Sequence, residues 1–122
     1  MYERDIFMVI IYDLTLWDEM YKLLKIKTKP PKIFFVIYDN KTKKELKQFK
    51  KYCKDHNIKC TPIKLRYKTW DDNLFYMALI IGKIIKKFDE NTSIEIYSCD
   101  PLRSLEYMWN SLGKNIRFPY LI

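Results

Sequence analysis

The sequence predicts an α/β fold in which a mainly parallel sheet is covered by helices on both faces. Three apolar runs rich in β-branched residues, at residues 6–12, 33–38 and 94–99, each stop at an aspartate: Asp13, Asp39 and Asp100. A helix-like segment follows each run at once. Apolar runs that alternate with helical patterns are typical of strands buried on both faces of a parallel sheet. Ligands bind beyond the carboxyl ends of such strands, so we expect the functional site at that edge.

The first half of the chain predicts two strand-helix units. A strand at residues 5–12 leads into a helix whose apolar positions keep helical spacing at Leu16, Met20, Leu23 and Leu24. Two prolines, Pro30 and Pro31, end this unit, and the second strand covers residues 33–38. The second helix begins after Asn40 and is one-sided: its inward positions are Leu46, Phe49 and Cys53, and lysines cover the rest of its surface.

A third strand is expected at residues 58–67, and Pro62 marks it as an edge or bulged strand. The helix that follows, residues 71–88, is apolar over most of its circumference. A helix of this kind is covered on more than one side, and in so small a domain the second cover is expected to be another copy of the chain. The sequence therefore predicts a homodimer formed through this helix.

The last unit pairs a strand at residues 93–98 with a helix and an edge strand. The inward positions of that helix are expected to be Leu102, Leu105, Met108, Trp109 and Leu112, and Gly113 stands where a helix-closing glycine belongs. Pro119 places the final strand, residues 116–121, at an edge. With right-handed crossovers, the simplest arrangement is a Rossmann-like three-layer sandwich of order 3-2-1-4-5, a single domain spanning residues 1–122.

The composition indicates which charge a partner would carry and in which compartment the protein works. The 122 residues hold 23 Lys and Arg against 15 Asp and Glu, a formal charge of +8, which favours an anionic partner but also suits a Lys-rich solvated surface. The three cysteines form no C-x-x-C pair, which argues against a disulfide framework and for a reducing compartment. The N-terminal segment has no signal-peptide pattern and no apolar stretch that could span a bilayer. We therefore expect a cytoplasmic protein that does not bind membranes.

Several common chemistries are excluded by residue type. The only glycines are Gly82 and Gly113, and neither follows a strand, so the glycine-rich phosphate loops of P-loop enzymes and dinucleotide-binding folds are absent. The single histidine, His56, has no nucleophile or metal-ligand pattern near it. We interpret His56 as a surface residue at the carboxyl end of the Lys-rich helix.

The three strand-end aspartates have two interpretations. Carboxylates that converge at one edge can hold Mg²⁺ or Mn²⁺ for phosphodiester cleavage. Each aspartate also stands directly before a helix, where its side chain would accept hydrogen bonds from the first free amides, and Pro101 after Asp100 is typical of a first helical turn. Because capping explains all three without a shared centre, we predict that no metal or other cofactor is bound.

The turns after the strands carry hydroxyl, amide and basic side chains. They are Thr15 after the first strand; Asn40, Lys41 and Thr42 after the second; Arg66, Lys68 and Thr69 after the third; and Ser98, Arg103 and Ser104 after the fourth. Together with helix amino ends on the same edge, they predict a phosphate-binding cradle built without glycine.

In the order and spacing of its parts, the chain resembles the CRISPR-associated Rossmann-fold (CARF) sensor domains. The segments that carry the likeness are Asp13-Leu14-Thr15-Leu16 after the first strand, the long helix at 71–88, and residues 93–104. Many members have a Thr-Gly-Gly-Thr-Lys-like loop in that last segment, whereas this chain has Ser98-Cys99-Asp100-Pro101-Leu102-Arg103, so Arg103 would replace the loop amides.

The resemblance implies a stand-alone domain that binds a cyclic oligoadenylate, as a sensor, a sponge or a metal-independent ring nuclease. The ligand-binding residues would be Asp13, Leu14, Thr15, Asn40, Lys41, Thr42, Arg66, Lys68, Ser98, Cys99, Arg103 and Ser104. Two alternatives stay open. One is a metal-dependent nuclease similar to the PIN and NYN families, using Asp13, Asp39 and Asp100. The other is a small viral or plasmid-encoded interaction protein that uses the fold only as a scaffold.

Overall fold

The computed structural model of the protein describes residues 7–17 and 33–119. In chain order its strands are β1 (Met8–Asp13), β2 (Ile33–Tyr38), β3 (Lys59–Lys64), β4 (Ser93–Tyr97) and β5 (Asn115–Arg117). Its helices are α1 (Leu14–Trp17), α2 (Lys43–Asp55), α3 (Trp70–Lys87) and α4 (Ser104–Asn110), with short 3-10 helices η2 (Asn40–Thr42) and η3 (Asp100–Leu102). The predicted helical positions Met20, Leu23 and Leu24 and the proline pair lie outside the described residues.

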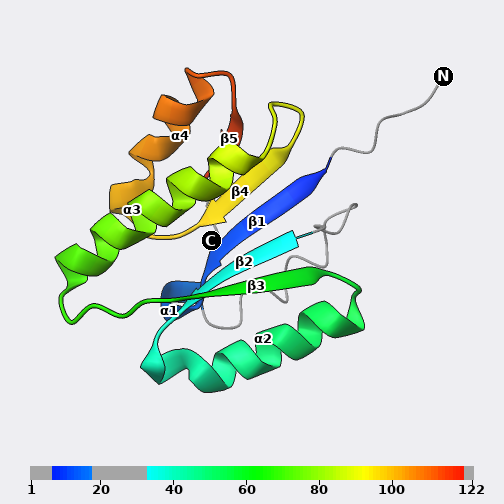
Figure 1. Ribbon diagram of the computed structural model, residues 1–122, viewed down its shortest axis with the longest axis vertical. Helices are drawn as coiled ribbons and strands as arrows, with labels where there is room; N and C mark the ends of the chain where they lie inside the picture. The colour runs from blue at the N-terminus through cyan, green and yellow to red at the C-terminus, as the bar shows by residue number, and fades with distance from the viewer. Residues whose placement is uncertain (1–6, 18–32, 120–122) are drawn as a thin grey trace.

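The five strands form one sheet in the order β3-β2-β1-β4-β5, and every neighbouring pair is parallel (Figure 1). The central strand β1 has a partner on each side, with Tyr12 opposite Val36 of β2 and Tyr97 of β4. This confirms the predicted α/β class, the strand order and the Rossmann-like arrangement. The carboxyl ends of the strands therefore meet at one edge, where their loops gather.

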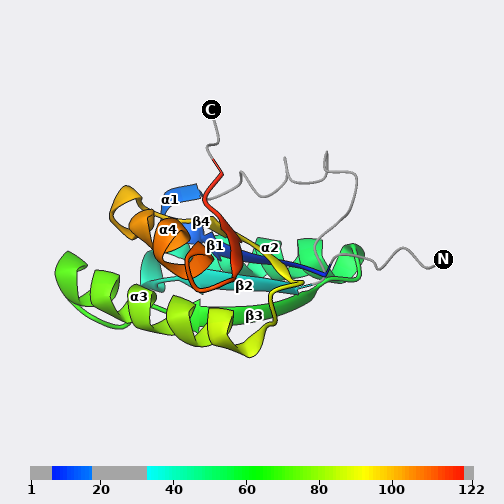
Figure 2. The same cartoon turned by 90° about the horizontal axis from the view of Figure 1, so that it is seen from above.

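Helices cover both faces of the sheet, which explains why the strands are apolar at successive positions rather than at alternate ones (Figure 2). Val9 and Ile11 of β1 belong to the core beneath α3 and α4, whereas Ile10 and Tyr12 belong to the core with α1 and α2. All four side chains are 0% exposed.

Both strands that prolines marked as edge strands lie at the edges of the sheet. Pro62 lies in β3, which is an edge strand as predicted. The strand β5 also lies at an edge, but it covers only Asn115–Arg117, so Pro119 follows the strand instead of standing inside it as expected. Tyr120 to Ile122, the last predicted residues of that strand, lie outside the described part of the chain.

The predicted inward faces of the helices are confirmed for α2 and only in part elsewhere. Leu46, Phe49 and Cys53 of α2 are buried. Around α4, however, the prediction was wrong for Met108 and Leu112, which are 56% and 72% exposed. The helix α4 ends at Asn110 and packs through one side only, so Met108 faces solvent and Leu112 lies in the turn beyond it.

The helix α3 is buried on one side and apolar on another. Thr69 caps it by accepting a hydrogen bond from the Asp72 amide, and Met77, Ile81, Ile84 and Ile85 enter the core. Gly82 lies against α4: a β-carbon there would stand 3.5 Å from the Trp109 ring. Phe75 and Leu79 are 74% and 58% exposed, so the described residues of one chain do not cover this second apolar side. None of the described helices is both long and apolar enough to cross a bilayer.

Candidate functional site

Two hollows open at the carboxyl edge of the sheet. The first, which we call the switch-point hollow, measures about 470 Å³ and lies at the ends of β1 and β4. These are the two strands between which the strand order reverses, the usual ligand position in open α/β sheets. It is lined by Leu16, Trp17, Ser98, Cys99, Asp100, Arg103 and Pro119.

The second, which we call the basic hollow, measures about 650 Å³ and lies at the ends of β2 and β3. It is lined by Asp39, Asn40, Lys41, Lys64, Leu65, Arg66, Tyr67, Lys68 and Asn73. Four of these side chains are cationic. The loop that carries Arg66 and Lys68 is fixed by Asn73, whose side chain accepts a hydrogen bond from the Tyr67 amide and donates one to the Tyr67 carbonyl, both at 3.1 Å.

Asp39, the only carboxylate among the described residues that line the basic hollow, accepts hydrogen bonds from its own segment of backbone. Its Oδ1 accepts hydrogen bonds from the amides of Lys41 and Thr42 at 2.9 and 3.0 Å. The Thr42 hydroxyl in turn accepts from the Asp39 amide, which completes a capping box on η2. The predicted capping role of Asp39 is confirmed, with Thr42 as its partner. The helix that Asp39 caps is η2, and the amino end of α2 itself has no side-chain cap.

Asp13 is the most deeply buried polar group at this edge, with 0% exposure. Its Oδ1 accepts hydrogen bonds from the amide and the hydroxyl of Thr15, at 2.9 and 2.5 Å, so it too caps the turn that follows its strand. Its Oδ2 has no hydrogen-bond partner among the described residues. Burial raises the pKa of Asp13; the bonds from Thr15 oppose this shift, and the negative charge of Asp39 adds to it.

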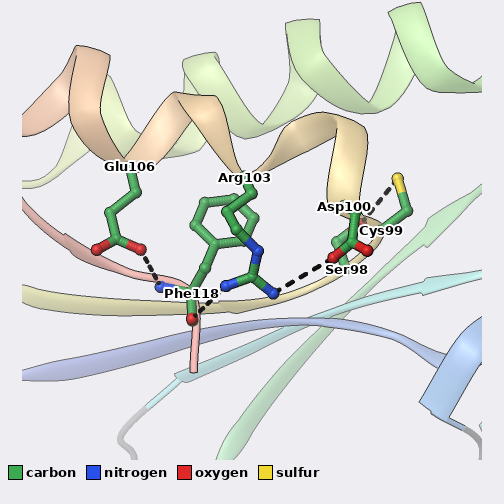
Figure 3. A network of polar contacts seen from close by, with 6 residues as sticks. All are labelled: Ser98, Cys99, Asp100, Arg103, Glu106 and Phe118. Carbon is green, nitrogen blue, oxygen red and sulfur yellow. Dashed lines mark hydrogen bonds and ion pairs between the residues drawn. The ribbon is translucent and has the colours of Figure 1, made fainter. Parts of the chain in front are cut away.

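Asp100 departs from the capping prediction. It lies inside η3, makes no cap, and its carboxylate lies 3.5 Å from the Arg103 guanidinium (Figure 3). Its side chain is 89% exposed, so the pair is a surface contact of small energetic weight. Cys99, the residue before η3, takes the N-cap position without a side-chain hydrogen bond to the helix amides, because its thiol is a weak acceptor. The thiol accepts a bond from the Ser98 hydroxyl instead, at 3.9 Å (Figure 3).

Arg103 ties the loop after β4 to the segment after β5. Its Nη1 donates to the Phe118 carbonyl at 3.0 Å, and its guanidinium carbon lies 5.9 Å from the centre of the Phe118 ring (Figure 3). The Phe118 amide donates to the Glu106 carboxylate at 2.9 Å, which holds the same segment from the other direction. Arg103 is thus partly structural, while its side chain also borders the switch-point hollow.

Cys99 and His56 carry two further reactive groups, a thiol and an imidazole. Burial raises the pKa of the Cys99 thiol, and the charge of Asp13 raises it further, so Cys99 is poorly suited to act as a thiolate nucleophile. The His56 ring lies against the Tyr52 carbonyl at 2.8 Å at the end of α2, as interpreted from the sequence. Within the described ranges, no group of three His, Cys, Asp or Glu side chains is arranged to hold a metal ion.

The predicted site residues divide among three locations. Ser98, Cys99 and Arg103 line the switch-point hollow, and Asn40, Lys41, Arg66 and Lys68 line the basic hollow. The others line neither hollow: Asp13 and Leu14 are buried in the fold, Thr15 and Thr42 bond to the aspartates, and Ser104 is the exposed first residue of α4.

Sequence reasoning missed Trp17, Lys64 and Tyr67 among the lining residues. A signal existed for the last two, because Lys64, Arg66 and Lys68 alternate along the chain and surround the exposed Tyr67. Comparison of the chain with family models, curated proteins and solved structures gave no match. The proposals below therefore rest on the sequence and on the geometry of the two hollows.

Proposed function

We propose that this protein binds an anionic nucleotide at the carboxyl edge of its sheet, and that the ligand is a cyclic oligoadenylate. The observation that carries the proposal is the basic hollow, where Lys41, Lys64, Arg66 and Lys68 surround one depression. Asp39, the one carboxylate among its described lining residues, accepts bonds from nearby backbone amides. Cationic side chains at this edge favour phosphate groups. The resemblance to CARF domains suggests the adenylate class.

The two hollows offer complementary surfaces along one edge. The switch-point hollow has apolar walls from Leu16, Trp17 and Pro119, which suit a nucleobase, and Arg103 at its border. The basic hollow offers charge for phosphates and the half-exposed Tyr67 ring. Several linked nucleotides match an apolar hollow followed by a basic one better than a single phosphate does.

Such a domain would act as a sensor, as a sponge that removes the messenger, or as a ring nuclease. Cleavage without a metal would begin with a ribose 2′-hydroxyl, which loses its proton and attacks the adjacent phosphorus. The 5′-oxygen then leaves with a proton, and a 2′,3′-cyclic phosphate remains. The chain would contribute positioning and cationic stabilisation of the phosphorane from the Lys and Arg side chains of the basic hollow.

A thermal-shift titration tests the binding proposal, because a ligand that binds only the folded state raises the melting temperature. We expect cyclic tetraadenylate or cyclic hexaadenylate to raise it, and linear oligoadenylate of equal length to raise it less. Lys41→Gln/Arg66→Gln/Lys68→Gln should remove the shift. A matched variant, Lys83→Gln/Lys86→Gln/Lys87→Gln, alters three exposed cations of α3 and should keep it. No shift with any cyclic ligand would refute the proposal.

One observation favours the metal-dependent nuclease as the second candidate function. Asp13 holds a buried carboxylate oxygen without a partner among the described residues, and Asp39 is close enough to raise its pKa. Carboxylates at the ends of the neighbouring strands β1 and β2 are the kind of ligand that Mg²⁺ prefers. Loss of phosphodiesterase activity in EDTA would favour this function over metal-independent cleavage.

We also propose that the protein forms a homodimer through α3. Phe75 and Leu79 stand four residues apart on this helix, which places them on the same side, and both are more than half exposed. An apolar patch of this kind on a helix is typical of a contact between protein chains. A second copy of the same helix would cover it with a matching surface.

A further inference from the structure

The positive charge of this protein is concentrated in one continuous segment. Between Lys41 and Lys68 there are eleven Lys and Arg residues and two carboxylates, Glu45 and Asp55, a net charge of +9. The whole chain carries +8, so all the other residues together carry −1. A lysine-rich surface that served solubility alone would distribute its charge over the molecule. The observed concentration instead indicates a surface directed at an anionic partner.

The fold turns this segment into one surface. The apolar side of α2 is buried, so its lysines face solvent, and four of them follow helical spacing as a stripe: Lys43, Lys47, Lys50 and Lys54. At 1.5 Å per residue this α2 stripe is roughly 16 Å long. The amino end of this stripe adjoins the basic hollow through Lys41. The helix α2 runs beside the edge strand β3, and the carboxyl end of β3 leads into the same hollow (Figure 1).

These charges are not neutralised within the described chain. Ten of the eleven basic side chains are exposed and Lys64 is half-buried. Among the described residues, no ion pair within 4.0 Å joins any of them to a carboxylate. Uncompensated like charges repel one another, and a bound polyanion would relieve that repulsion while releasing its own counterions.

Aromatic side chains stand at the end of this surface. Tyr67 lines the basic hollow with 52% exposure, and its ring is supported edge-on by Tyr76 at a centroid distance of 5.5 Å. Trp70, three residues further on, is 49% exposed. Exposed aromatic rings beside a row of cations are the combination that binds single-stranded nucleic acid, because unpaired bases stack on the rings while the phosphates meet the cations.

We infer that the surface formed by the α2 stripe and the basic hollow binds single-stranded nucleic acid. A membrane surface fits less well, because the apolar residues of α2 face the sheet and none of its described side chains is a large exposed hydrophobic. An acidic protein also fits less well, because lysine is depleted at the cores of protein interfaces. This inference goes beyond the proposed nucleotide site: the two share the basic hollow, and only the polymer would need the α2 stripe.

Fluorescence anisotropy with a labelled single-stranded RNA of about 20 nucleotides tests the inference. We expect binding whose log affinity falls linearly with log salt concentration, by about 0.7 for each phosphate contacted. Lys47→Gln/Lys50→Gln/Lys54→Gln should lower the affinity at least tenfold and reduce the salt slope by about 2, since three contacts are lost. The matched variant Lys83→Gln/Lys86→Gln/Lys87→Gln carries the same change of charge on α3 and should bind like the parent protein.

Tyr67 separates stacking from charge. Tyr67→Ala should weaken RNA binding about tenfold, whereas Tyr67→Phe, which keeps the ring, should bind normally. A duplex of the same length that bound equally well would overturn the assignment to single strands. Equal losses of RNA affinity in the α2 and α3 lysine variants would refute the assignment of binding to this surface. Binding to phosphatidylserine vesicles but not to RNA would refute it as well. The α2 variant should still give the thermal shift with cyclic oligoadenylate, so this inference and the proposed function can fail separately.

Discussion

Asp13 shows at the scale of one residue how a local bond and burial act in opposite directions. The hydrogen bonds from Thr15 stabilise the charged carboxylate, yet its burial disfavours that charge more strongly, and the pKa of Asp13 is raised. A carboxyl group with a higher pKa in the folded than in the unfolded protein holds its proton more tightly when folded. Its contribution to stability is therefore greatest below the unfolded pKa of about 4 and falls as pH rises through the raised value.

Asp13→Asn should consequently be tolerated by the fold. Asparagine keeps an oxygen that can accept the bond from the Thr15 amide and removes the buried charge, so we expect stability at pH 7 that is equal to the parent protein or up to about 1 kcal/mol higher. The advantage of the variant should grow between pH 4 and pH 7 in urea unfolding experiments. An advantage that shrinks with rising pH would contradict the raised pKa. If the protein cleaves phosphodiesters, cleavage that is retained in Asp13→Asn would favour capping, and its collapse would favour a metal ligand.

Arg103 has both a structural and a proposed binding role, and the two can be separated. Arg103→Ala leaves the partly buried Phe118 carbonyl without its donor, so we expect a loss of about 1–2 kcal/mol in the free energy of unfolding. Binding of the cyclic ligand, measured by calorimetry well below the melting temperature, should weaken by at least ~1.5 kcal/mol if a charge-assisted bond to phosphate is lost. Glu106→Gln is the control that keeps Arg103 while altering the acceptor of the Phe118 amide. Unchanged affinity in Arg103→Ala would remove this residue from the site.

At the scale of elements, α3 packs against α4 at Gly82. A β-carbon at Gly82 would meet the Trp109 ring at 3.5 Å, an ordinary van der Waals distance, and the backbone at Gly82 is helical. Alanine there should be accommodated and favour the helix by roughly 0.5–1 kcal/mol. We expect Gly82→Ala to raise the denaturation midpoint and Gly82→Leu to lower it by displacing the indole. A destabilised alanine variant would show that the two helices pack more tightly than this distance implies.

At the scale of the whole molecule, the question is how many copies of the chain assemble. If α3 forms the proposed homodimer, Phe75→Glu/Leu79→Glu should convert a dimer into a monomer without lowering stability, because both side chains are already exposed in one chain. Light scattering at micromolar concentration measures this directly. Leu112→Glu, which places a charge on another exposed leucine, is the matched control and should leave the assembly unchanged. A monomeric parent protein would refute the dimer.

Most of the fold could be predicted because the strands are buried on both faces. Continuous apolar runs such as residues 33–38 identify such strands directly, and Pro62 identified an edge. Side-chain burial on the short helices was harder to predict. Periodicity is reliable over several turns, yet α4 has only seven residues, and Met108 follows the apolar spacing although it faces solvent.

The sequence predicted that the candidate site lies at the carboxyl edge of the sheet, but it did not predict the hydrogen-bond partners of the site residues. Strand order brings the loops together, but hydrogen bonds decide the role of each side chain. The sequence places Thr42 near the site, whereas its bond to Asp39 depends on local geometry. The same holds for Arg103, whose acceptor is the carbonyl of Phe118, fifteen positions along the chain. Lys64 was not predicted because lysines are common on edge strands, where they prevent edge-to-edge pairing with other chains.

The position of β1 at the centre of the sheet has a consequence for how the chain is made. Val9 pairs with Ile33 on one side and with Ile94 on the other, so one partner of β1 is synthesised long after β1 itself. Until β4 emerges from the ribosome, one edge of β1 and the apolar faces beside it lack their cover. Pairing across so long a stretch closes a large loop and slows folding. A nascent chain of this protein therefore needs β4 to complete its core, and termination before β4 would leave an aggregation-prone intermediate rather than a smaller folded domain.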